Sequence, residues 1–188
     1  MKLNVLYMRT AWSRGQASPQ VREALLRAGW QRLYPSRSFP AKRFQHTIEG
    51  QPYLPGEAFS FSLSHVDGLS VLACAPEGRI GVDLVHAPDA ALAAQLAPTF
   101  FTPAEQQALA QRLFTPLQLW SRKEAVLKAA GSGLLLDPGQ AEVSGASSQV
   151  LGRGYWLRST VFLDEYELSL ATEWAAGLPE LTEYTEVR

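Results

Sequence analysis

The sequence has 188 residues, of which 46% are hydrophobic, a length and composition that fit one ordinary folded domain or two small ones sharing a core. Seventeen lysines and arginines stand against eighteen aspartates and glutamates, so the chain is nearly neutral and shows no overall attraction to nucleic acid or an anionic membrane. These values exclude a largely disordered chain, and any site for an anion must be local.

Cysteine content and hydropathy bear on the compartment. The single cysteine, Cys74, lies in an apolar stretch and is expected to be a small core residue, because one cysteine permits no internal disulfide. The first twelve residues hold too short an apolar run for a signal peptide, and nowhere do about 18 apolar residues run unbroken. We therefore expect a cytoplasmic protein that does not span a membrane.

The first half of the chain predicts a strand, a helix and a meander of strands. Residues 3–8 alternate as a strand does, and Ser18-Pro19 opens a stretch, 21–34, with apolar residues at helical spacing. Proline, glycine and charge then interrupt the chain, apart from a short edge strand in KRFQHTI. Residues 59–85 contain extended segments separated by Asp-Gly and Glu-Gly pairs, the turn chemistry of antiparallel strands.

The second half predicts three helices followed by strands. Residues 91–97 and 103–114 have helical patterns, and the second of them opens with a capping box. The longest helix is expected over 117–130, ended by Gly131 and Gly133. After a polar loop, residues 155–161 and 166–173 have the composition of strands.

Each half therefore predicts a helix with a few strands. We expect an α+β fold made of a pseudo-two-fold pair of similar subdomains, residues 1–82 and 83–188, with the active site at their junction. The chain shows no sequence repeat between the halves, so the duplication rests on their similar content.

Three segments carry a resemblance to a known family: FSLSH at 61–65, GVDLV at 81–85 and WSRKEAVLK at 120–128. Their order and spacing resemble the signature blocks of the 4′-phosphopantetheinyl transferases, and the long third block is the most specific. The length of the chain also resembles that of the duplicated, monomeric, surfactin-synthetase-activating type within this family. The resemblance implies transfer of the phosphopantetheine arm of coenzyme A to a serine of an apo acyl or peptidyl carrier protein, with Mg²⁺ as cofactor and release of adenosine 3′,5′-bisphosphate.

The implied chemistry needs carboxylates beside cations, because a pyrophosphate must be neutralised while an oxygen leaves. Glu124 and Lys128 are four residues apart, so they share a helix face, whereas Lys123 is turned about 100° away. Asp83 follows an apolar strand and is expected near its end, where it could face the helix that carries Glu124. By resemblance Asp83 and Glu124 bind the metal, Glu124 takes the serine proton directly or through a water, and Lys128 stabilises the leaving group. The plainer alternatives are an ordinary helix-surface ion pair and an aspartate that turns the chain.

Two positions depart from the usual family pattern. Val85 stands where a second acidic residue is common, and valine cannot bind a cation, so the third metal ligand stays open and water could take its place. Gln51 replaces the lysine of a G-K-P turn.

Coenzyme A contacts are expected mainly in the first subdomain. Ser64 and His65 resemble the family's serine-histidine pair that contacts phosphates, and their adjacency argues against a serine hydrolase. The residues carried over as coenzyme A ligands are Ser64, His65, Lys123, Lys128, Gln51, Arg14, Arg9 and Arg43. For the arginines, ordinary surface exposure is an equal alternative.

Two functional alternatives remain open from the sequence. A binding module for coenzyme A or a carrier protein that has lost turnover is favoured by Val85 and Gln51, while Asp83, Glu124 and Lys128 argue against it. A hydrolase that uses water as the acceptor would share the metal chemistry. The expected partners are coenzyme A and one carrier protein, with no nucleic acid or membrane, and the chain is expected to act as a monomer.

Overall fold

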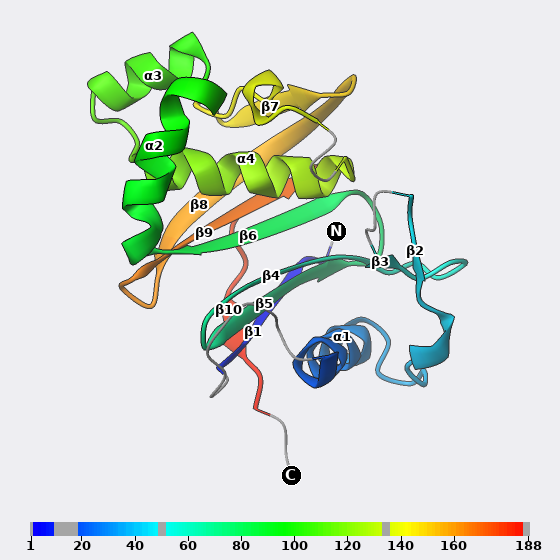
Figure 1. The fold of residues 1–188 in the computed structure, drawn as a ribbon. Coiled ribbons are helices and arrows are strands. Elements are labelled where there is room, and N and C mark those ends of the chain that lie inside the picture. The colour runs from blue at the N-terminus through cyan, green and yellow to red at the C-terminus, as the bar shows by residue number, and fades with distance from the viewer. Residues whose placement is uncertain (1, 10–18, 49–51, 133–135, 186–188) are drawn as a thin grey trace.

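The structure is a computed structural model that describes residues 2–9, 19–48, 52–132 and 136–185. Two four-stranded sheets form its body, and a long helix lies on one face of each (Figure 1). Among the residues discussed above, Arg14, Ser18, Gln51 and Gly133 lie outside the described ranges.

The first sheet has the strand order β10-β1-β5-β4. Its strands are β1 (Asn4–Arg9), β4 (Ser60–Val66), β5 (Leu69–Ala75) and β10 (Leu181–Glu183). β1 pairs antiparallel with β5 and parallel with β10, so the end of the chain returns to its beginning. The β4–β5 turn uses Gly68 at φ +77°, a left-handed conformation that glycine adopts without steric cost.

Helix α1 (Pro19–Leu33) covers this sheet (Figure 1). Its apolar face packs on β1 and β5, with Leu25 and Trp30 at most 1% exposed. A Cβ on Gly29 would lie 2.7 Å from the Leu72 side chain, so the missing side chain allows the close approach. Cys74 is fully buried, which confirms that it is a core residue, and this burial raises the pKa of its thiol to about 12.

The second sheet has the order β6-β9-β8-β7 and is antiparallel throughout. Its strands are β6 (Ile80–His86), β7 (Ser147–Val150), β8 (Arg153–Phe162) and β9 (Tyr166–Thr172). Helix α4 (Pro116–Ala130) lies on this sheet, and α2 (Ala90–Phe100) and α3 (Pro103–Ala110) lie beyond α4 (Figure 1). The short strands β2 (Gln45–His46) and β3 (Pro52–Tyr53) form a separate ribbon.

The two sheets meet where β4 runs beside β6 (Figure 1). Apolar side chains from both sheets, among them Val71, Val82 and Leu168, form one buried cluster between them. The hydroxyls of Ser62 and Ser64 accept hydrogen bonds from the backbone N–H groups of Val82 and Leu84, at 3.0 and 3.1 Å. We call this contact between Ser62–Ser64 and Val82–Leu84 the seam.

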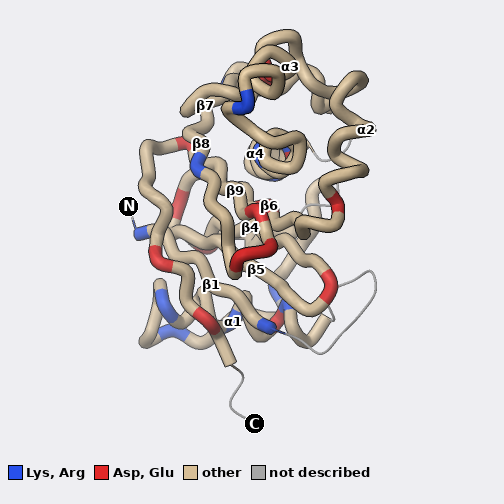
Figure 2. The backbone as a smooth tube through the Cα atoms, turned by 90° about the vertical axis from the view of Figure 1, so that its left-hand side faces the viewer, with Lys and Arg blue, Asp and Glu red and all other residues tan. Residues whose placement is uncertain are grey.

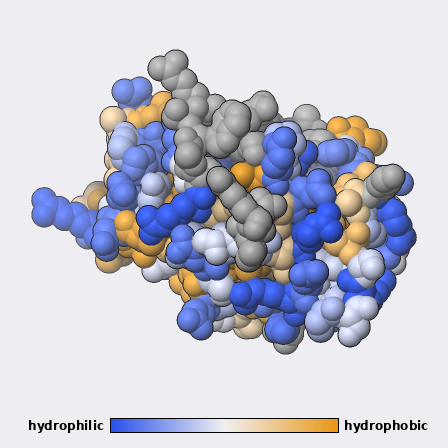
Figure 3. Space-filling model, turned by 90° about the horizontal axis from the view of Figure 1, so that it is seen from below, coloured by the Kyte–Doolittle hydropathy of each residue, from blue (hydrophilic) through white to orange (hydrophobic). Residues whose placement is uncertain are grey.

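Charge is spread over both halves (Figure 2), in keeping with the neutral composition. Helix α1 carries a local excess of positive charge, with Arg22, Arg27 and Arg32 against Glu23. The face seen from below in Figure 3 is mostly hydrophilic with small apolar patches. Among the described helices, none has the length and hydropathy needed to cross a bilayer.

The expected helices and long strands are present, although α3 ends at Ala110, before the predicted end at residue 114, and the mixed α and β content is as predicted. Strands β3, β7 and β10 were not predicted, and KRFQHTI forms a short 3₁₀ turn followed by the two-residue β2. The predicted division at 82/83 falls inside β6, and β10 joins the sheet of the first half. Both the division and the pseudo-two-fold relation stay predictions.

Candidate active site

Asp83 lies at the centre of a polar cluster beside the seam. The residue is 5% exposed, and its Oδ1 accepts hydrogen bonds from the Lys128 ammonium at 2.6 Å and the Ser64 hydroxyl at 3.1 Å. The Lys128 ammonium also donates to the Ser64 hydroxyl at 3.0 Å. Strand β4, strand β6 and helix α4 thus each contribute one member, and these three come from the three segments singled out in the sequence.

Local structure explains why these side chains meet. Residues alternate across a strand, so Val82 and Leu84 enter the core between the sheets while Asp83 faces α4. Helix α4 is fixed at its start by a capping box on Thr115 and at its end by Gly131 at φ +73°. The Ser121 hydroxyl donates to the Asp83 carbonyl at 3.4 Å, so the helix also contacts the strand at the site.

Glu124 is half-buried on the same helix, one turn before Lys128. Burial raises its pKa, the negative charge of Asp83 raises it further, and Lys128 opposes both effects. The structure therefore brings Asp83, Glu124, Lys128 and Ser64 together, and a carboxyl with a raised pKa is suited to accept a proton.

The residues present fit a hard cation that prefers oxygen ligands. The second carboxylate oxygen of Asp83, Oδ2, is buried and has no hydrogen-bond partner among the described residues. Such an oxygen carries a desolvation cost that a cation would offset. Within the described ranges, no three His, Cys, Asp or Glu side chains already stand together as a metal site. Asp83 and Glu124 would hold the ion, and magnesium keeps several waters in such sites.

Lys123 does not reach this cluster, which corrects the prediction that it contacts coenzyme A. Its side chain is 0% exposed, and its ammonium pairs with the equally buried Glu105 at 2.8 Å. The same ammonium donates to the carbonyls of Pro138 and Ala141 at 3.0 and 2.5 Å. An ammonium has three donors, so those of Lys123 are already used inside the core. The turn of about 100° from Glu124 explains its inward direction.

Ser64 and His65 point to opposite faces of β4, as expected for neighbours in a strand. Ser64 is buried at the seam, whereas His65 is exposed. His65 borders a cavity of about 370 Å³ between α1, β4 and Pro52. Its described lining residues are Arg22, Leu25, Pro52, Leu63, Ser64, His65 and Ser70.

Arg22 is the lining residue that the sequence interpretation missed. It lies in the first turns of α1, exposed and three residues before Leu25, which lines the same cavity. In the sequence, the only sign of this role is a charged residue placed between the core residues Val21 and Leu25. The approach of Arg22 to His65 depends on how α1 packs against the sheet. Arginine binds phosphate through two parallel N–H groups, so this cavity suits a phosphate.

Arg9 and Arg43 contact acidic neighbours. Arg9 pairs with Glu183 at 3.4 Å and Arg43 pairs with Glu57 at 2.5 Å. The pKa of Glu57 lies below its ordinary value, chiefly because Arg37 donates hydrogen bonds to its carboxylate. Burial acts in the opposite sense, and the charges of Arg37 and Arg43 lower the pKa further. Neither Arg9 nor Arg43 is among the described residues that line this cavity.

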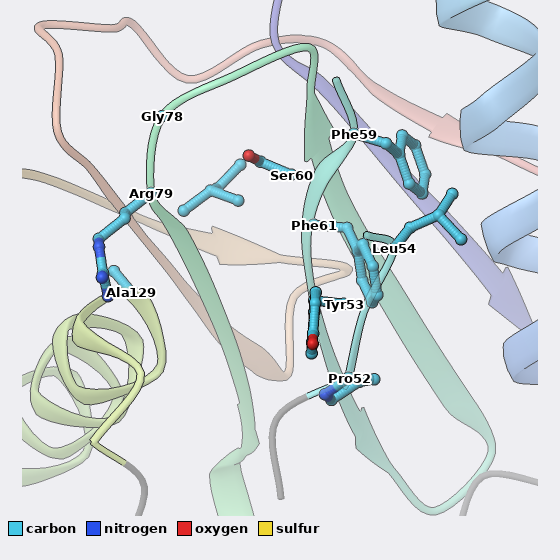
Figure 4. A pocket seen from close by; sticks show the side chains of 10 residues that line it. Pro52, Tyr53, Leu54, Phe59, Ser60, Phe61, Gly78, Arg79 and Ala129 are labelled. Atoms are coloured by element: carbon cyan, nitrogen blue, oxygen red, sulfur yellow. The ribbon is translucent and has the colours of Figure 1, made fainter. Parts of the chain in front are cut away.

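A second cavity, of about 290 Å³, lies between the halves near the end of α4 (Figure 4). The segment Pro52–Leu54, the start of β4, Arg79 and Ala129 surround it. Arg79 donates to the Ala130 carbonyl at 2.7 Å, which ties β6 to the last turn of α4. The two cavities thus follow successive parts of β4 and both reach Pro52.

The fold and site define a two-sheet α/β protein with an acidic site beside a lysine, and comparisons identify its class. The profile of the 4′-phosphopantetheinyl transferase superfamily matches residues 79–178, so the chain belongs to this superfamily. It is similar to the 4′-phosphopantetheinyl transferase HetI of Nostoc sp. (strain PCC 7120), with 33% identity over 104 residues, 49% of this chain and 43% of HetI. It is also similar to slr0495 of Synechocystis sp. (strain PCC 6803), provisionally named for the same activity, with 37% identity over 81 residues, 39% of this chain and 32% of that protein. The matched stretches span less than half of either relative.

Proposed function

We propose that this chain transfers the 4′-phosphopantetheine arm of coenzyme A to a serine of an apo acyl or peptidyl carrier protein. The observation that carries the proposal is the Asp83 carboxylate, held by Lys128 and Ser64 with one buried oxygen left without a described partner and Glu124 beside it. Superfamily membership and the names of the two relatives support the same reaction.

Each residue has a distinct task in this reaction. Asp83 and Glu124 would hold magnesium, and the bound ion would neutralise the pyrophosphate charge. Glu124 takes the proton from the carrier serine directly or through a water. The serine oxygen bonds to the β-phosphorus as the bond from that phosphorus to the bridging oxygen breaks, and adenosine 3′,5′-bisphosphate leaves. Lys128 lies where its ammonium can stabilise the developing negative charge.

Coenzyme A has several phosphates, and the cavity beside the site has the chemistry to bind one of them. Arg22 and His65 offer donors at its wall, and Ser64 connects that wall to Asp83 across β4. This assignment replaces Arg9 and Arg43, whose guanidinium groups are paired with carboxylates. Because Ser64, Asp83 and Lys128 all come from one chain, we propose that the protein acts as a monomer.

Intact-mass spectrometry of an apo carrier protein tests the proposal directly. The carrier is incubated with this chain, coenzyme A and magnesium, beside a reaction with a chelator, the Glu124→Ala variant and the matched surface variant Glu165→Ala. We expect the carrier to gain the phosphopantetheine mass with the wild type and Glu165→Ala only, because Glu165 is an exposed residue that pairs with His86 away from Asp83.

The other outcomes separate the alternatives. Coenzyme A binding without any mass gain across several carriers would replace the proposal with a binding module. Release of adenosine 3′,5′-bisphosphate in the absence of a carrier would point to a hydrolase that uses water as the acceptor.

A further inference from the structure

Val85 on β6 lies opposite an acidic residue, Glu167, on β9, the neighbouring strand of the sheet. β6 and β9 pair antiparallel, with Asp83 opposite Ser169 and Val85 opposite Glu167. Directly opposite residues point to the same face of a sheet, with Cβ atoms about 4.5 to 5.5 Å apart. Leu168 packs in the cluster between the two sheets, so Glu167 points to the other face, toward α4. Glu167 therefore lies on the face that carries Asp83.

Glu167 is a buried acid whose charge is only partly compensated. The residue is 8% exposed, and its Oε2 has no hydrogen-bond partner among the described residues. Burial raises its pKa, and a hydrogen bond with Gln118 at the start of α4 opposes that effect. A buried carboxylate oxygen without a partner is costly, and a glutamine would keep the contact with Gln118 at lower cost. A cation is a partner that would offset the cost of this buried oxygen.

We propose that Glu167 supplies, from β9, the carboxylate that Val85 cannot supply from β6, and so completes the cation site with Asp83 and Glu124. The inference rests on the proposed function, because that function requires the cation. Within the described ranges no three carboxylates already stand close enough to hold an ion, so Glu167 turns from Gln118 toward the site when the cation enters. The buried oxygens Glu167 Oε2 and Asp83 Oδ2, each without a described partner, then become ligands.

Manganese binding to the enzyme, without carrier protein, tests this role separately from turnover. Mn²⁺ prefers the same carboxylate and water ligands as Mg²⁺, and the electron paramagnetic resonance signal of the free ion reports how much is bound. Titrations are made on the wild type, Glu167→Gln, Glu165→Gln and the double variant Val85→Glu/Glu167→Gln, each with and without coenzyme A.

We expect Glu167→Gln to weaken Mn²⁺ binding by about tenfold or more, since even groups that only support a ligand cost 10–100-fold in affinity. Glu165→Gln should bind as the wild type does, and the double variant should regain most of the lost affinity because the acid returns on the neighbouring strand. Melting without metal checks that Glu167→Gln is folded, and its melting temperature should be no lower than that of the wild type.

Unchanged Mn²⁺ affinity in Glu167→Gln would overturn the inference and leave Glu167 as a structural partner of Gln118. Failure of the double variant to regain affinity would overturn the idea of replacement across the strands. Absence of Mn²⁺ binding by a wild type that still modifies the carrier would remove the inference alone. Glu167-dependent Mn²⁺ binding without carrier modification would instead remove the proposed function.

Discussion

Gly81 sets the distance between the strand that carries Asp83 and the helix that carries Lys128. A Cβ at this position would lie 1.9 Å from the Ala125 carbonyl oxygen and 2.6 Å from the Ala129 nitrogen, both backbone atoms of α4. A flexible side chain could move aside, but a helix backbone moves only as a unit. Gly81→Ala should therefore push α4 away from β6.

The size of the displacement follows from the contact distance. Ala125 O must retreat from 1.9 Å to the ordinary 3.4 Å, a movement of about 1.5 Å. The same movement would stretch the 2.6 Å contact between Asp83 and Lys128 beyond hydrogen-bond length unless the lysine follows. Overpacking of this kind costs about 1–3 kcal/mol. A misplacement of about 1 Å near the chemistry can cost about 10²-fold in rate.

Urea unfolding and the mass assay for carrier modification measure the two effects, with Gly177→Ala as the matched control. A Cβ on Gly177 meets no described atom within 4 Å, so this change should be neutral or stabilise by less than about 1 kcal/mol. We expect Gly81→Ala to unfold at lower urea and to lose kcat/KM about 10²-fold in the fraction that stays folded. Wild-type stability and turnover in Gly81→Ala would refute the view that the close approach of β6 and α4 builds the site.

Three further substitutions test the roles of residues on α4. Glu124→Gln should slow transfer by about 10² to 10⁴-fold. Because the folded pKa of Glu124 is raised above 4.5, the folded wild type binds more protons than the unfolded chain and loses stability as the pH rises from 4.5 through the folded pKa. Without metal, the variant should therefore be as stable as the wild type near pH 4 and more stable at pH 7 in urea unfolding. Lys128→Met should lower kcat and cost about 1–3 kcal/mol in urea unfolding, because buried Asp83 loses its ammonium partner. Lys123→Met should cost about 3–5 kcal/mol by leaving Glu105 without its partner, yet calorimetry on the folded protein should give an unchanged Kd for coenzyme A.

The elements that the sequence predicted well are those with strong local signals. Helix α4 has a capping box at Thr115 and a left-handed glycine at Gly131, and both signals lie within a few residues of the ends they define. β7 and β10 carry little such signal, because they have only four and three residues. β7 pairs with β8, which follows it directly in the chain, whereas β10 depends on pairing with β1 at the other end of the chain. Long-range pairing of this kind is not encoded in a local pattern.

The candidate site divides in the same way. The shared helix face of Glu124 and Lys128 and the opposite faces of Ser64 and His65 followed from the helical and strand periods alone. The burial of Lys123 did not, because the acid that neutralises it, Glu105, comes from another helix. Arg22 was missed for a similar reason, since its approach to His65 depends on how α1 packs across the sheet.

Ser64 has no spare hydrogen-bonding capacity in the structure, and this limits how a substrate can enter the site. A hydroxyl has one donor and two acceptor positions. Ser64 uses the donor on Asp83 and accepts from Lys128 and from the Leu84 backbone. A phosphate that needs a hydrogen bond from Ser64 must therefore break its bond to Asp83, which leaves that carboxylate free for a cation. Binding of the anion and binding of the cation thus favour each other, and Lys128, the most exposed of the three side chains, is the one able to follow the phosphate.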